Sequence, residues 1–140
     1  MFPVAMTLER LESSPVGAPL APILVLDDDP DLLKMVERVL AHDGRSVVTA
    51  TDPVAALELY ERARPCLVVV DLMLPHMDGE EFLQALVRRF GDPRPPVIIL
   101  SASAVRSEVA SRVGAEASLG KPFEIDDLRD MVARFCDAPA

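Results

Sequence analysis

Several residue types that mark particular classes of protein are scarce in this 140-residue chain. It has two cysteines and two histidines, and aromatic residues make up 4% of the sequence, with no tryptophan. Cys66 and Cys136 form neither a metal-binding spacing nor the framework of a disulfide-rich domain, and we expect both thiols to be reduced. The scarcity argues against a zinc-centred or disulfide-stapled protein.

Positive charge and long apolar runs are also lacking. Lysine and arginine number 14 against 23 acidic residues, which gives a formal charge of −9. Nucleic acid and anionic lipid repel such a surface unless a local basic patch intervenes, and the sequence has no basic run. No apolar segment reaches the length of a membrane span, and the N-terminus lacks the features of a signal peptide. We expect a cytoplasmic protein that binds neither nucleic acid nor membrane directly.

Hydrophobic residues, by contrast, make up half of the sequence, which is ample for the core of one domain. Prolines and a glycine interrupt residues 1–21, and no periodic pattern is sustained there. We therefore expect a flexible N-terminal tail over residues 1–21, a folded domain over 22–137 and a short C-terminal tail over 138–140.

The folded part repeats one pattern five times, an apolar run followed by a helical pattern. The runs lie at residues 23–26, 46–50, 67–70, 97–100 and 117–119. Asp29-Pro30 and Asp52-Pro53 have the form of a helix cap followed by proline at the first helical position. Continuous apolar runs indicate strands that are covered on both faces, as in parallel sheets. The pattern predicts an α/β fold, a doubly wound five-stranded parallel sheet.

Polar side chains follow several of these strands. Asp27 and Asp28 come after the first strand and Asp71 after the third, so neighbouring placement of these strands would bring three carboxylates together. Such a cluster needs protons or a cation, and Mg²⁺ suits a set of oxygen donors. Lys121 and Ser101, at two further strand ends, add a positive charge and a hydroxyl. Together these groups are suited to phosphoryl transfer onto a carboxylate.

Four segments at strand ends carry a resemblance to a known family. They are Asp27-Asp28, Asp71-Leu-Met-Leu-Pro-His-Met-Asp-Gly, Ser101-Ala102 and Lys121-Pro122-Phe123. In this order they resemble the response-regulator receiver domain of two-component signalling, over about Pro22 to Cys136. The resemblance implies the flavodoxin-like (βα)5 fold.

The resemblance also implies a role for each matching residue. Asp71 would be the phosphate acceptor and a Mg²⁺ ligand, Asp28 a direct ligand, and Asp27 a ligand mainly through a bound water. Met73 would offer its backbone carbonyl to the metal. Ser101 would supply the hydroxyl that shifts toward the phosphoryl group, and Lys121 would pair with that group.

The resemblance also bears on two residues near Lys121. Pro122 would follow a cis peptide bond. Ser118 stands where the family most often has tyrosine or phenylalanine, whose ring moves inward on activation. Because serine cannot reproduce that movement, we expect the surface response to be carried by the backbone of residues 102–113.

The resulting expectation is a standalone receiver that is not a conventional enzyme and catalyses only its own phosphorylation and dephosphorylation. A histidine kinase or phosphotransfer protein would deliver the phosphoryl group. The domain would pass it onward in a relay or dock to a downstream protein target, and a homodimer could use the fourth helix, fifth strand and fifth helix.

Two other functions stay open at this point. A pseudo-receiver would bind partners without phosphorylation, but such domains usually lose part of the acid pair or the lysine, and all are present here. A Mg²⁺-dependent phosphohydrolase of the haloacid dehalogenase type needs a second acid two residues after its nucleophile, where this chain has Met73.

Overall fold

The structure, a computed structural model, describes residues 21–74, 78–102 and 106–137. Within these ranges five strands alternate with five helices. The strands are β1 (Ile23–Leu26), β2 (Val47–Ala50), β3 (Leu67–Asp71), β4 (Val97–Ser101) and β5 (Ala117–Gly120). The helices are α1 (Pro30–His42), α2 (Pro53–Ala63), α3 (Gly79–Phe90), α4 (Arg106–Val113) and α5 (Ile125–Cys136). The expected tails, apart from Ala21, lie outside the described residues.

All five strands are parallel and form one sheet in the order β2-β1-β3-β4-β5. The predicted fold is confirmed, including the neighbouring placement of the first and third strands. The register pairs Leu26 with Val70 and Ser101 with Gly120. Because parallel strands end at the same edge, the residues that follow β1, β3, β4 and β5 meet there.

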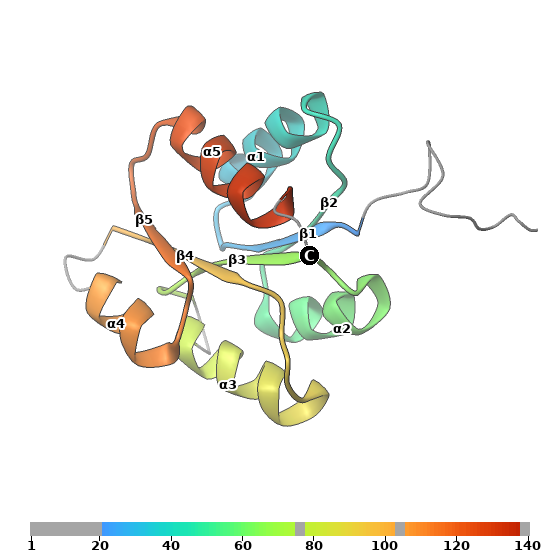
Figure 1. The fold of residues 1–140 in the computed structure, drawn as a ribbon, viewed down its shortest axis with the longest axis vertical. Coiled ribbons are helices and arrows are strands. Elements are labelled where there is room, and N and C mark those ends of the chain that lie inside the picture. Colours follow the sequence, from blue (N-terminus) through green and yellow to red (C-terminus); the bar gives the residue numbers. More distant parts are fainter. Residues whose placement is uncertain (1–20, 75–77, 103–105, 138–140) are drawn as a thin grey trace, which may run out of the picture.

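Helices cover both faces of the sheet, α1 and α5 on one side and α2, α3 and α4 on the other (Figure 1). Alternate residues of β1 point to opposite faces, so Ile23 and Val25 pack with α1 and α5, whereas Leu24 and Leu26 pack with α2 and α3. Every residue of β1, β3 and β4 is buried. These buried strands therefore form the rigid centre of the sheet, and the residues at their ends are held in fixed positions.

Aspartate side chains start three of the helices. Asp29 accepts hydrogen bonds from the backbone N–H groups of Asp31 (3.0 Å) and Leu32 (3.3 Å), and Asp52 accepts one from Ala55 (3.0 Å). Asp78 forms a reciprocal capping box with Glu81 at the start of α3. Each such cap stabilises a helix start by about 1 kcal/mol. The two cap-plus-proline signals in the sequence thus mark real helix starts.

Gly79 lets the start of α3 lie directly against the end of β3. A Cβ atom at this position would lie 2.8 Å from the carbonyl oxygen of Asp71 and 3.1 Å from Cα of Leu72. The Gly79 N–H also donates a hydrogen bond to the Leu72 carbonyl at 3.1 Å. A side chain at this position would therefore push against the backbone that carries Asp71.

We predict that Gly79→Ala lowers the free energy of unfolding by about 1–3 kcal/mol, because backbone atoms cannot move aside as a side chain would. Urea unfolding of both proteins measures the difference. Gln84→Ala, an exposed change in the same helix, is the control and should stay within about 0.5 kcal/mol of the parent. Equal stability of Gly79→Ala and the parent would show that the contact is easily relaxed.

Candidate functional site

Three carboxylates meet at the edge of the sheet where the strands end. Asp27 follows β1 directly, Asp28 is next to it, and Asp71 is the last residue of β3. One oxygen from each of the three lies within 4.8 Å of the others. Asp27 is completely buried and Asp71 nearly so, whereas Asp28 is exposed. The structure thus brings together the three acids that the sequence predicts to converge, and solvent reaches them on the side of Asp28.

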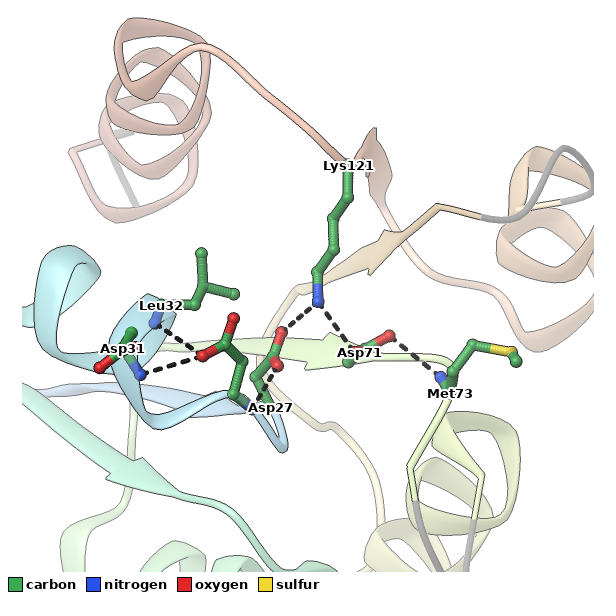
Figure 2. Close-up of polar contacts among 7 residues, drawn as sticks. Asp27, Asp31, Leu32, Asp71, Met73 and Lys121 are labelled. Carbon is green, nitrogen blue, oxygen red and sulfur yellow. Dashed lines mark hydrogen bonds and ion pairs between the residues drawn. The ribbon is translucent and has the colours of Figure 1, made fainter.

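Lys121 reaches into this cluster from the residue after β5 (Figure 2). Its Nζ lies 2.6 Å from Oδ2 of Asp27 and 2.9 Å from Oδ2 of Asp71. One ammonium group therefore bridges two buried carboxylates from different strands. The peptide bond between Lys121 and Pro122 is cis, as the family resemblance implies.

Backbone N–H groups hold the other oxygen of each buried carboxylate. Oδ1 of Asp27 accepts a hydrogen bond from the N–H of Asp29 at 2.9 Å, and Oδ1 of Asp71 accepts one from the N–H of Met73 at 3.0 Å. Both are contacts from residue i to i+2, the pattern of an Asx turn. Met73 as a whole is 69% exposed, and it contacts the site through its backbone N–H.

Burial and pairing act in opposite directions on these groups. Burial raises the pKa of Asp27, and the hydrogen bonds from Lys121 and the Asp29 N–H offset only part of that rise. Burial alone would lower the pKa of Lys121, but its hydrogen bonds to Asp27 and Asp71 outweigh this and leave its pKa raised. The ammonium therefore stays charged, and the buried Asp27 carboxylate keeps a cost of burial that its hydrogen bonds do not fully offset.

The charge that remains fits a divalent cation. Three carboxylates carry a formal −3 and the ammonium +1, which leaves −2 at the cluster. All the donors are oxygens, and the exposed side at Asp28 leaves room for water or phosphate oxygens to complete a coordination shell. Mg²⁺ prefers this combination of few carboxylates and several exchangeable oxygens. The residues present therefore fit Mg²⁺.

Ser101 lies beside the lysine. It ends β4, is fully buried, and its carbonyl accepts a hydrogen bond from the Lys121 N–H at 3.0 Å. Ser118 is half-buried in β5, where it pairs with Ile99, two residues before the end of the strand. Ser101 thus lies at the strand end beside Lys121, and Ser118 lies further back in the sheet.

A comparison with known protein families identifies the family of this domain. The model of the response regulator receiver domain matches residues 23–133. The chain belongs to the response-regulator receiver family. Members of this family are signalling domains that take a phosphoryl group from histidine kinases, signal to downstream targets and bind Mg²⁺ at an acidic site.

Curated relatives include two mycobacterial proteins. The chain is 36% identical over 123 residues to the probable transcriptional regulatory protein TcrX of Mycobacterium tuberculosis, covering 86% of this chain and 50% of the relative. It is 38% identical over 107 residues to the response regulator MprA of Mycobacterium leprae, covering 76% and 46%. The chain thus spans about half the length of these relatives, and the standalone expectation stays a prediction.

Solved structures give the same result. The chemotaxis protein CheY4 of Vibrio cholerae superposes with a TM-score of 0.75 at 30% identity, over 83% of this chain and 98% of that one. The receiver domain of the sensor histidine kinase PA1611 of Pseudomonas aeruginosa superposes with a TM-score of 0.74 at 26% identity, over 85% and 99%. That protein holds a magnesium ion in its active-site cleft.

In the part of the chain that the structure describes, no helix combines the length and the apolar character needed to cross a membrane.

Sequence reasoning missed two features that build the site. One is the pair of Asx-turn contacts that orient Asp27 and Asp71. The spacing of Asp27 and Asp29 could have suggested the first of these contacts. The other is the close approach of Gly79 to β3, which no local pattern reveals because it depends on how α3 packs.

Removing the lysine charge should make the site more dependent on a cation. Without Mg²⁺, Lys121→Ala should lower the free energy of unfolding by about 1–3 kcal/mol, since Asp27 and Asp71 lose their charged partner. Saturating Mg²⁺ should then stabilise this variant about 1 kcal/mol more than it stabilises the parent, because the ammonium no longer competes for the same oxygens. Thermal unfolding with and without Mg²⁺ measures both effects.

Lys34→Ala provides the matched control, because Lys34 is the only other lysine and is exposed on α1. It should respond to Mg²⁺ as the parent does. The same Mg²⁺ effect in Lys121→Ala and the parent would contradict the competition between ammonium and cation.

Proposed function

We propose that this domain accepts a phosphoryl group on Asp71 from a histidine kinase or phosphotransfer protein, in a Mg²⁺-dependent reaction within the cytoplasm. The phosphorylated state then signals through a protein-binding surface. The observation that carries the proposal is the position of Asp71, with Lys121 bound to one oxygen and two further carboxylates beside it. Asp27 is also buried and bound to Lys121, but Asp71 ends the central strand β3 and is the acid that the family resemblance implies as the acceptor.

The reaction uses the Asp71 carboxylate as the nucleophile. An oxygen of Asp71 forms a bond to phosphorus while the bond from phosphorus to the donor nitrogen breaks, and the donor imidazole keeps the electron pair. The Met73 N–H holds Oδ1, which leaves Oδ2, on the side of Lys121, as the attacking atom. When bound, Mg²⁺ neutralises charge on the phosphoryl oxygens.

Lys121 changes partners during this reaction. Its ammonium lies 2.9 Å from the Asp71 oxygen that attacks, so it can move to a phosphoryl oxygen while it keeps its 2.6 Å contact with Asp27. The Ser101 hydroxyl, from the neighbouring strand end, then donates to the phosphoryl group. Asp28 and Asp71 would hold Mg²⁺ directly and Asp27 mainly through a bound water. The backbone carbonyl of Met73 would be the remaining protein ligand.

The response reaches the surface through the segment that follows Ser101. Because Ser118 has no ring to swing inward, the backbone of residues 102–113 carries the change, of which residues 103–105 lie outside the described part. The surface formed by α4, β5 and α5 is then the site for a downstream target or a second copy. The domain also hydrolyses its own aspartyl phosphate, and the exposed Met73 side chain supplies no acid for turnover of other phosphate esters.

Incubation with acetyl phosphate and Mg²⁺ tests the acceptor. Intact mass spectrometry should show the gain of one phosphoryl group in the parent and none in Asp71→Asn, because the amide is not a nucleophile. Asp52→Asn is the control: Asp52 is also an aspartate near a strand end, but it caps α2 and should not affect labelling. Persistent labelling of Asp71→Asn, or labelling that survives a chelator, would contradict the assignment.

The two acids after β1 should differ in their effect on metal binding. We expect Asp28→Ala to weaken Mg²⁺ binding by about tenfold or more and Asp27→Ala by less, since one ligates directly and the other mainly through water. Isothermal titration of each variant with Mg²⁺ gives the dissociation constants. Equal losses in the two variants would overturn this order.

A further inference from the structure

The two cysteines, 70 residues apart in sequence, are in contact at the edge of the sheet opposite the acidic cluster. Cys66 immediately precedes β3, whereas Asp71 ends that strand, and Cys136 is the last residue of α5. Their Sγ atoms lie 3.3 Å apart. The sequence gives no indication of this contact, and it serves no role in the proposed phosphoryl transfer.

A small cavity gives access to the two sulfur atoms. Its volume is about 90 Å³, and both thiols are only partly buried. Since a single water needs roughly 10–15 Å³ of such space, a molecule as small as hydrogen peroxide can enter. The cavity is lined by Ala21, Ile23, Arg45, Ser46, Cys66 and Cys136.

The surroundings make the two thiols unequal. Either thiol can donate the hydrogen bond that joins the two sulfur atoms; this contact lowers the pKa of Cys66 to about 7 and raises the pKa of Cys136. Arg45 lowers the pKa of Cys66 further, while burial and Asp137 oppose the shift. Arg45 is itself ion-paired with Asp137 at 2.8 Å. In its protonated form, Cys66 donates instead to the Ala21 carbonyl at 3.3 Å.

We propose that Cys66 and Cys136 form a reversible redox pair, which hydrogen peroxide converts to a disulfide that ties the end of α5 to the start of β3. In the first step the Cys66 thiolate attacks one peroxide oxygen, the O–O bond breaks, and a sulfenic acid and hydroxide result. In the second step the Cys136 sulfur attacks the Cys66 sulfur, and the sulfenic oxygen leaves as water with the Cys136 proton. Overall, two thiols are oxidised by two electrons and one peroxide is reduced to two waters.

The geometry requires little movement for the second step. A disulfide bond is about 2.05 Å long, so the sulfurs must approach by roughly 1.2 Å from their 3.3 Å contact. The bond would close a long loop that includes β3, α3, β4, α4, β5 and α5. Such a closure restricts the unfolded chain, so oxidation should stabilise the domain. Because the pair lies at the opposite edge from Asp71, the reaction provides a second input that is separate from phosphorylation.

The test is treatment of the full chain with hydrogen peroxide, followed by denaturation, alkylation and intact mass spectrometry. The parent should become lighter by two hydrogen atoms, resist alkylation, form no covalent link between chains, and recover both thiols on reduction. Peptide mapping should link Cys66 to Cys136. The rate should rise as the pH increases through about 7, because the thiolate is the nucleophile.

Single variants separate the two roles. Cys136→Ser should accumulate a sulfenic acid at Cys66 that a dimedone probe traps, and Cys66→Ser should react at least about tenfold more slowly with peroxide. The oxidised parent should melt roughly 5–10 °C above its reduced form, whereas neither variant should gain stability on oxidation.

Three results would overturn the proposal. They are two alkylatable thiols after peroxide treatment, a disulfide that forms only between chains, and equal peroxide reactivity of Cys66→Ser and Cys136→Ser. Each is distinct from the outcome of the phosphoryl-transfer tests, since Asp71→Asn keeps both cysteines.

Discussion

The ammonium group of Lys121 holds together a site that would otherwise repel itself. Asp27 and Asp71 are buried at the ends of adjacent strands, and each gives one oxygen to this single cation, at 2.6 and 2.9 Å. Removing the cation would destabilise the fold, because two buried carboxylates would be left without compensation. Lys121 therefore links β1, β3 and β5 electrostatically, and the shape of the acidic cluster depends on it.

This arrangement also explains how the site can respond to a phosphoryl group. The ammonium neutralises only one of the three negative charges, so the cluster keeps a net negative charge. A divalent cation would balance this charge, and it would also place positive charge beside an incoming phosphoryl group. In the proposed reaction, Lys121 would exchange its contact with Asp71 for one with the phosphoryl group and keep its contact with Asp27. The sheet contributes rigidity, because its buried strands hold the backbone of the site residues in place.

The sequence predicts most of the fold because the relevant signals are local. Apolar runs mark the strands, and Asp29-Pro30 and Asp52-Pro53 mark two helix starts whose caps the structure contains. The convergence of Asp27, Asp28 and Asp71 follows from strand order in a parallel sheet. The apolar side of α5 is buried at Leu128 and Val132, while Ile125, Met131 and Phe135 are partly covered.

Contacts between distant segments could not be predicted in the same way. The pairing of Lys121 with both Asp27 and Asp71 depends on side-chain conformation, and the resemblance suggested only a phosphoryl partner. The ion pairs Arg45–Asp137 and Arg129–Asp43 join residues that are 92 and 86 positions apart. The Cys66–Cys136 contact arises the same way, since α5 returns to the start of β3. Such pairs depend on packing, which leaves no periodic pattern in the sequence.

The most direct test of the central claim is a crystal structure of the protein with Mg²⁺ and beryllofluoride, a mimic of the phosphoryl group. The account predicts beryllium bonded to the Asp71 carboxylate, Mg²⁺ beside Asp28, and the Lys121 ammonium hydrogen-bonded to a fluorine while it still contacts Asp27. A Lys121 ammonium still paired with the Asp71 carboxylate, or beryllofluoride bound at another residue, would contradict it.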